Sequence, residues 1–107
     1  MIIRMWHGRV KHDDSEAYRL FLIERAIPDY QSVDGNLGVR ILERRGDDST
    51  HFITMTSWES LEAIKAFAGE DAEKAKYYPE DDGFLLEFEP SVVHYEVVGR
   101  SSEFSEE

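Results

Sequence analysis

A histidine near the end of the chain and an arginine near its start are the residues best suited to acid–base chemistry. The imidazole of His94 has an ordinary pKa close to neutrality, so His94 is the best general-base candidate. The alternative is a half-exposed histidine on an edge strand. Arg4 lies among apolar residues of a predicted strand, where a buried guanidinium needs a carboxylate or an anionic ligand. We predict an ion pair between Arg4 and Glu96, with stabilisation of a bound anion as the alternative.

Other polar residues give weaker indications of a site. His7 and His51 are secondary candidates for the same general base. His7 and His12 do not have a spacing that would converge ligands as two histidines one helical turn apart do, so we predict no metal site. The acidic run at 80–82 is expected to form a solvated turn or to cap a helix. The absence of Cys excludes thiolate nucleophiles and Cys–zinc sites.

The composition indicates one small globular domain. Hydrophobic residues make up 41% of the 107 residues and charged residues 33%, and the net charge of −11 argues against a nucleic-acid partner. No apolar run approaches the roughly 20 residues that span a bilayer, and the start of the chain lacks a signal-peptide pattern. We therefore expect a cytoplasmic protein with one domain over residues 1–100 and an acidic, flexible tail over 101–107, with no membrane partner.

The elements that must position these residues are organised around the stretch 50–78. It begins with strand alternation and continues with apolar residues at helical spacing. Ser57 or Ser60 can cap the helix, and Gly69 can end it. Trp58 falls at the strand-to-helix junction, where the mouth of a pocket often lies.

The remaining elements give the order β-α-β-β-α-β. The pattern predicts further strands over 1–10, 37–45 and 91–99, a first helix over 15–30 that Pro28 kinks or stops, and a second helical piece over 70–77. Segment 80–89 is expected to be a loop with some strand character. This order is typical of an α+β, ferredoxin-like fold with a four-stranded antiparallel sheet. Right-handed crossovers place strands one and three in the centre and both helices on one face.

The other face of this sheet has no covering element in the predicted fold. Strands one, three and four carry apolar or aromatic residues on both faces. Such a bare apolar face exceeds what monomers usually expose, and a two-fold dimer is the simplest way to bury it. We therefore predict a homodimer.

Six short motifs resemble those of a known family. They are I-x-R-x-W-x-G at 2–8, D-G-N-x-G at 34–38, W-x-S at 58–60, A-I-x-A-F-A-G at 63–69, Y-Y-P-E-D at 77–81 and H-Y-E-V at 94–97. Over residues 1–99 the chain resembles the antibiotic biosynthesis monooxygenase superfamily of dimeric α/β barrels.

The resemblance implies oxidation of a small aromatic, polyketide-like compound by O₂ in an apolar pocket, without metal or other cofactor. In that interpretation His94 is the base and Arg4 stabilises an enolate or phenolate. The pocket walls would be aromatic and come from Trp6, Trp58, Phe67, Tyr77 and Tyr78. The alternative is a non-catalytic homodimer of the same fold that binds a small ligand or is purely structural.

Haem degradation is another chemistry of this superfamily, and we favour it less than oxidation of an aromatic compound. Its haem-degrading members carry an Asn on the first strand, a Trp nine residues after the junction Trp and a His about ten residues later. At the corresponding positions this chain has His7, Phe67 and Tyr77. All three depart from the haem pattern, although Tyr can ligate ferric haem.

Overall fold

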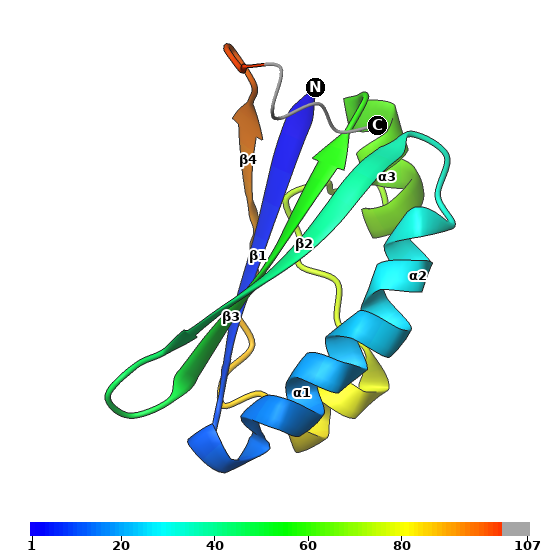
Figure 1. Ribbon diagram of the computed structural model, residues 1–107. Helices are drawn as coiled ribbons and strands as arrows, with labels where there is room; N and C mark the ends of the chain where they lie inside the picture. Colours follow the sequence, from blue (N-terminus) through cyan, green and yellow to red (C-terminus); the bar gives the residue numbers. More distant parts are fainter. Residues whose placement is uncertain (102–107) are drawn as a thin grey trace.

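A four-stranded antiparallel sheet carries the helices on one face (Figure 1). The computed structural model describes residues 1–101. The strands are β1 (Ile2–Val10), β2 (Asn36–Arg45), β3 (Thr50–Trp58) and β4 (Val93–Glu96). The helices are α1 (Ser15–Phe21), the π-helical η2 (Leu22–Ala26), α2 (Ile27–Gln31) and α3 (Leu61–Ala68), with short 3₁₀ turns η1 (His12–Asp14) and η3 (Pro79–Gly83). The predicted element order and fold class are confirmed.

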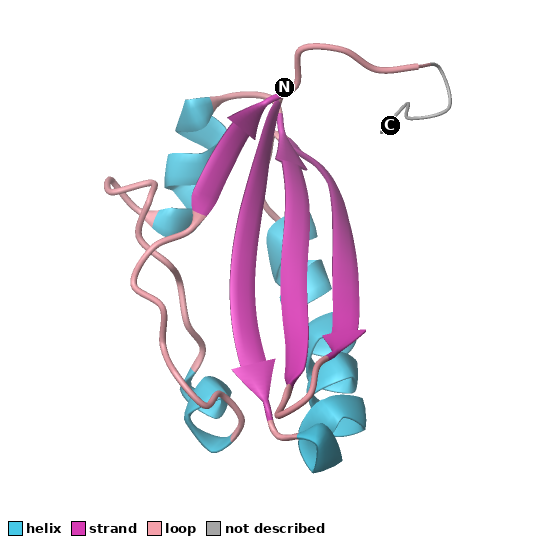
Figure 2. Ribbon diagram, turned by 90° about the vertical axis from the view of Figure 1, so that its left-hand side faces the viewer, coloured by secondary structure: helices cyan, strands magenta, loops and turns pink. Residues whose placement is uncertain are grey.

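The sheet has the order β2-β3-β1-β4, so strands β1 and β3 are central as predicted. Figure 2 shows the four strands in front with the helices behind them. Strand β4 is shorter than the predicted span 91–99. Ser91 forms a bridge with Lys74 instead of pairing with β1. Just beyond the strand, the Val97 N–H donates to the Met1 carbonyl at 3.0 Å.

The predicted kink at Pro28 takes the form of a widened turn. The N–H of Ile27 donates to the carbonyl of Leu22, five residues back, which is the π-helical pattern. Proline lacks an N–H and its ring clashes with the carbonyl four residues back, so a wider turn just before it relieves the clash. Helical structure continues to Gln31, one residue beyond the predicted end.

The junction between β3 and α3 follows the sequence pattern. Ser60 accepts a hydrogen bond from the Ala63 N–H at 3.1 Å and is the N-cap, whereas Ser57 lies within the strand. Gly69 ends the helix with φ of 97°, a conformation that favours glycine.

The predicted helical piece over 70–77 is wrong. Residues 70–92 instead form a strap with little regular structure besides η3. Its two ends pair with each other, because the Ala75 N–H donates to the Pro90 carbonyl and the Val92 N–H to the Glu73 carbonyl, both at 2.9 Å. These bonds satisfy backbone groups that a helix would have used internally.

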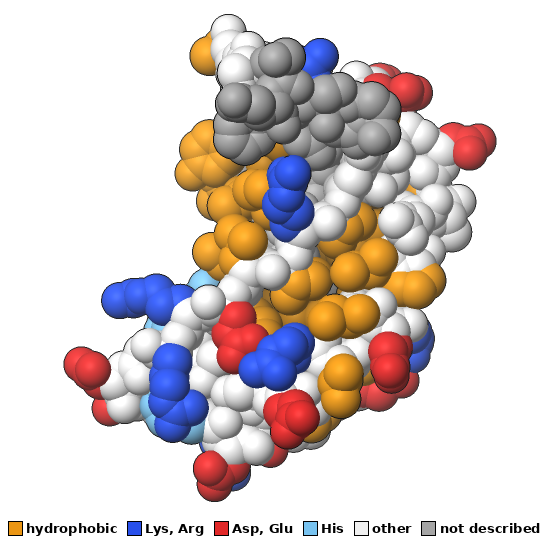
Figure 3. Space-filling model, viewed as in Figure 1, with side chains coloured by type: hydrophobic (Ala, Val, Ile, Leu, Met, Phe, Trp, Pro, Cys, Tyr) orange, Lys and Arg blue, Asp and Glu red, His pale blue; other side chains and the backbone are white. Residues whose placement is uncertain are grey.

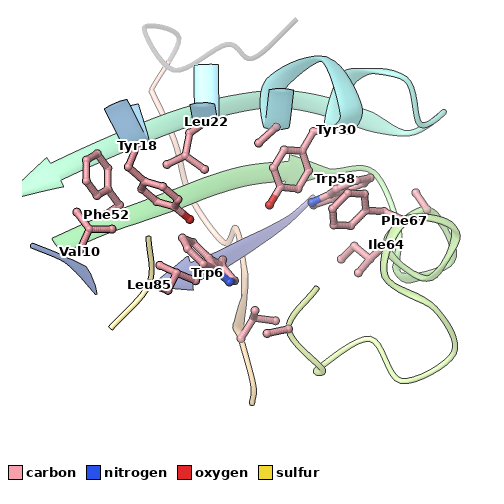
Figure 4. Packing of buried hydrophobic residues seen from close by; sticks show 14 residues of the cluster. Trp6, Val10, Tyr18, Leu22, Tyr30, Phe52, Trp58, Ile64, Phe67 and Leu85 are labelled. Atoms are coloured by element: carbon pink, nitrogen blue, oxygen red, sulfur yellow. The ribbon is translucent and has the colours of Figure 1, made fainter. Parts of the chain in front are cut away.

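The core lies between the sheet and the helices and is largely aromatic. Figure 4 shows Trp58, Phe67 and Tyr30 at one end, Phe52 and Tyr18 at the other, and Trp6 between them. Tyr30 stacks on Phe67 with ring centroids 4.5 Å apart. The packing leaves these rings almost without solvent contact.

The opposite face, which we call the open face, is covered by no helix of residues 1–101. Its exposed apolar side chains include Leu42, Val93 and Tyr95, with 40%, 51% and 57% of their surface accessible. In Figure 3 an apolar area lies above basic and histidine side chains that gather toward the β2–β3 hairpin. The predicted homodimer stays a prediction. Within residues 1–101 no helix is long and apolar enough to cross a membrane.

Candidate active site

Arg4 and His94 face each other across neighbouring strands. The antiparallel register of β1 and β4 pairs the two residues directly, on the face covered by helices and strap. Arg4 is 1% exposed, and its Nη2 donates to the Lys74 carbonyl of the strap at 3.0 Å. Its Nε has no acceptor among the described residues. Burial lowers the pKa of Arg4.

The predicted ion pair between Arg4 and Glu96 is wrong. The register places Glu96 opposite Ile2, and its carboxylate lies 3.6 Å from the N-terminal nitrogen of Met1. No carboxylate within residues 1–101 forms a salt bridge with Arg4. The guanidinium instead lies 5.6 Å from the centre of the Phe67 ring.

His94 is half-buried, as the competing interpretation of an edge-strand histidine expected, but one ring nitrogen is deeply placed. Its Nε2 is buried and has no hydrogen-bond partner among the described residues. Burial lowers the pKa of His94, and the nearby charge of Arg4 lowers it further. The imidazole is therefore neutral at pH 7, and a neutral imidazole can accept a proton.

Trp6 of β1 adds a third unsatisfied nitrogen to the same face of the sheet. Its indole is 5% exposed and packs edge-on against Tyr77 of the strap at 6.1 Å between ring centroids. Its Nε1 acts on the Tyr77 hydroxyl, but no acceptor among the described residues meets hydrogen-bond geometry. Gly8 makes this position possible. A Cβ there would lie 2.6 Å from the Trp6 ring and 2.9 Å from Leu85.

The predicted wall residues take different places. Trp6 and Tyr78 line a small cavity between helices and sheet, and Tyr77 covers Trp6 from the strap. Trp58 lies fully in the core beside Phe67 with ring centroids 5.8 Å apart, and its indole N–H donates to the Thr56 hydroxyl at 2.8 Å. The cavity has a volume of only about 10 Å³ because aromatic side chains fill the space.

A buried carboxylate under the strap is a feature that the sequence did not reveal. Asp81 is 2% exposed, whereas its neighbours Glu80 and Asp82 are exposed as a solvated turn would be. The Tyr18 hydroxyl donates to Asp81 Oδ1 at 2.9 Å, and the Tyr78 N–H donates to Oδ2 at 2.7 Å. Burial raises the pKa of Asp81 while these two hydrogen bonds act in the opposite direction.

Two further contacts fasten the strap over the site. The Tyr78 hydroxyl donates to Asp29 Oδ2 at 2.5 Å, and Lys76 Nζ lies 3.4 Å from the same oxygen. Lys76 also lies 4.1 Å above the Phe67 ring. The strap therefore closes the site by polar contacts to α2 and by cation–π contact.

The other histidines lie away from this site. His7 and His51 are on the open face, where His7 Nδ1 lies 2.5 Å from Glu89 Oε2 and His7 Nε2 lies 2.9 Å from His51 Nδ1. His12 bonds to the Thr50 hydroxyl at 2.9 Å. In the described part of the chain no three His, Asp or Glu side chains are arranged to hold a metal ion.

The fold matches solved structures over almost the whole chain. A candidate antibiotic biosynthesis monooxygenase from Nitrosomonas europaea has a TM-score of 0.66 and 17% identity, over 92% of this chain and 100% of that one. A similar protein from Bacillus cereus has a TM-score of 0.61 and 18% identity, over 95% of each chain. The heme degrader MhuD of Mycobacterium tuberculosis, solved with two hemes bound, has a TM-score of 0.65 and 20% identity, over 95% of this chain and 100% of that one.

These identities show a shared fold and do not by themselves transfer an activity. A search of curated proteins finds no match. The model of the family described as antibiotic biosynthesis monooxygenase matches residues 1–75, well over half of the chain. With the confirmed β-α-β-β-α-β sheet, this match shows that the chain belongs to the antibiotic biosynthesis monooxygenase family.

Proposed function

We propose that this protein is a cofactor-independent monooxygenase for a small aromatic compound that carries an acidic C–H or O–H group. The observation that carries the proposal is the set of three buried nitrogens on one face of neighbouring strands: Arg4 Nε, Trp6 Nε1 and His94 Nε2. A buried polar group without a partner costs about 1–3 kcal/mol. Oxygen atoms of a bound substrate would satisfy the donors among them and recover that cost.

His94 and Arg4 have complementary roles in this reaction. The neutral imidazole of His94 removes a proton from the substrate, and the guanidinium of Arg4 stabilises the resulting enolate or phenolate. With an anthrone as substrate, the carbanion transfers electrons to O₂ and a C–O bond forms, giving a peroxide. Loss of water then breaks the O–O bond and leaves a carbonyl. One O₂ oxidises one CH₂ to C=O, and no external reductant is needed.

Substrate entry requires the strap to move. The cavity beside Trp6 has a volume of about 10 Å³, far below the roughly 300 Å³ of a typical ligand site, and neither Arg4 nor His94 lines it. Within residues 1–101, one hydrogen bond joins Arg4 to the strap, and opening must also break the contacts of Tyr78 and Lys76 with Asp29. We propose that residues 70–78 lift from Arg4 and Trp6 to admit the aromatic ring.

The closed cavity also supports the second candidate function, a non-catalytic structural homodimer. In that case the aromatic core would stay filled and no aromatic compound would bind. Haem fits the site poorly. Phe67 is packed in the core, His7 lies on the open face, and the Tyr77 hydroxyl already donates to the Glu89 carbonyl.

We further propose that two copies pair through the open face. Its exposed apolar side chains come from β2 and β4, and partly buried ones such as Ile3, Met5 and Ile53 lie between them. Burying them is favourable, and a second copy presents the same surface. Sedimentation would show a species of twice 12.4 kDa.

The cytoplasmic location and the domain limits at residues 1–100 stay predictions.

Kinetics of the His94→Gln variant test the enzymatic proposal. With anthrone and air, kcat/KM of the variant should fall at least about a hundredfold, because a general base contributes about 10²–10⁴. The parent rate should rise with pH until His94 is deprotonated and reach its plateau by neutral pH, because the pKa of His94 is lowered. His12→Gln is the matched control and should keep the parent rate. Equal rates in parent and His94→Gln would reject His94 as the base. If the parent neither binds nor oxidises anthrone, the structural alternative is favoured.

A further inference from the structure

A hydrogen-bonded chain of Glu89, His7 and His51 crosses the open face. His7 Nδ1 lies 2.5 Å from the Glu89 carboxylate, and His7 Nε2 lies 2.9 Å from His51 Nδ1. The carboxylate fixes the proton of His7 on Nδ1, so His7 Nε2 accepts the Nδ1–H of His51. The Nε2 of His51 is then left with a lone pair, where a further proton can bind.

Charged groups surround this chain on every element that packs against it. The sheet register places Arg9 of β1 and Arg44 of β2 directly opposite His51, one on each side. Glu87 of the strap pairs with Arg9 at 2.9 Å, and Asp48 of the hairpin acts on Arg9 from a greater distance.

The four charged groups that contact or flank the histidine pair balance when both histidines are neutral. Glu43 is paired with Arg19, and Asp48 acts on Arg9 rather than on His51. Arg9 and Arg44 contribute two positive charges, and Glu87 and Glu89 contribute two negative ones. A proton added to the histidine pair leaves one excess positive charge between two arginines. Burial lowers the pKa of His51, and the charges of His7, Arg44 and Arg9 lower it further.

The histidine pair lies beside the apolar part of the open face. A hollow of about 410 Å³ adjoins it and is lined by His7, His51, Arg44, Leu42, Ile53 and Glu43. A second copy covering this face would remove the pair from water, and burial of an unbalanced charge is strongly unfavourable.

We propose that pairing of two copies through the open face is controlled by protonation of the His7–His51 pair, and that only the neutral pair is compatible with the dimer. This inference rests on the dimer proposed above and adds its regulation. A protomer whose histidine pair is protonated must release that proton before it can associate, so acid dissociates the dimer. The direction in which acid changes the dimer dissociation constant distinguishes this proposal from a general effect of net charge. The chain carries a net charge of −11 with His neutral, so acid lowers its overall repulsion and would otherwise strengthen association.

Sedimentation equilibrium of the full chain at pH 7.5 and pH 5.5 tests the proposal, with circular dichroism to confirm folding. The dimer dissociation constant should rise at least about tenfold at the lower pH, since two protons are linked to each dimer. His51→Gln keeps a hydrogen-bonding group but cannot bind the proton, and it should lose most of this dependence. Glu89→Gln leaves the cluster positive and should weaken the dimer already at pH 7.5. His12→Gln changes a histidine that contacts the Thr50 hydroxyl and the Asp47 carbonyl on the helix-covered face of the sheet, and this variant should behave as the parent.

The outcomes separate the two proposals. A dimer whose dissociation constant does not change with pH, or becomes smaller in acid, would overturn the proton control and leave the dimer standing. A monomer at both pH values would overturn both. A dependence that persists unchanged in His51→Gln, or disappears in His12→Gln, would show that another group is responsible.

Discussion

Replacement of Tyr18 by Phe removes one hydroxyl group from the buried contact that anchors the strap. The ring keeps its packing against Phe52 and Phe84, at 5.3 and 5.1 Å between centroids, so no cavity forms. The Asp81 carboxylate loses the donor at 2.9 Å and keeps only the Tyr78 N–H. A hydrogen bond to a charged group contributes about 1.5–3 kcal/mol, so we expect the free energy of unfolding to fall by about 2 kcal/mol at neutral pH.

The same variant should be less affected in acid. Burial places the pKa of Asp81 in the folded protein above its unfolded value, and the Tyr18 hydroxyl opposes this rise. A carboxyl group whose pKa is higher in the folded protein than in the unfolded chain binds more protons in the folded state. Its contribution to stability therefore falls as the pH rises through the window between the unfolded and the folded pKa. Loss of the hydroxyl raises this pKa further and enlarges the fall. Below the window the carboxyl is neutral in both states and the variant is penalised less.

Urea unfolding at neutral and acidic pH measures both effects. A loss of about 2 kcal/mol corresponds to a midpoint shift on the order of 1 M in urea. Glu24→Gln is the control, because Glu24 is exposed on the helical side of the molecule and its change should alter stability by no more than about 0.5 kcal/mol. A Tyr18→Phe variant as stable as Glu24→Gln would refute the assignment of Asp81 as a buried anchor of the strap.

Two further substitutions test how the fold positions the site. Ser60→Ala removes the N-cap acceptor of α3 and should cost about 1 kcal/mol in thermal or urea unfolding, and an unchanged melting temperature would contradict the capping role. Gly8→Ala introduces a Cβ 2.6 Å from the Trp6 ring, so it should destabilise by about 1–3 kcal/mol and shift the tryptophan emission spectrum. Parent-like emission and stability would show that Trp6 is not held against the backbone at Gly8.

Local signals in the sequence were enough to predict most of the fold. Strand alternation over 50–58 followed by helical spacing, with Ser60 and Gly69 as end signals, predicted β3 and α3 correctly. The apparent helical spacing over 70–77 failed for a non-local reason. The backbone of Ala75 finds its partner at Pro90, fifteen residues later, and that pairing overrides helix propensity.

The candidate site was only partly predictable. Placing His94 opposite Arg4 needs the register of β4, which a sequence cannot define to one residue, and so Glu96 was wrongly paired with Arg4. Burial of Asp81 was hidden because it stands between two exposed acidic residues in a stretch with turn composition. The filling of the cavity depends on how the strap packs on Trp6 and Tyr30, and no local pattern encodes that.

Oxygen uptake tests the central claim most directly. The purified chain, freed of metal and supplied with anthrone but no flavin or reductant, should consume one O₂ for each anthraquinone formed, at a rate proportional to protein concentration. His94→Gln should reduce uptake to the spontaneous rate of anthrone in buffer. Uptake by the parent no faster than that of buffer alone would contradict the assignment of Arg4, Trp6 and His94 as an oxidation site.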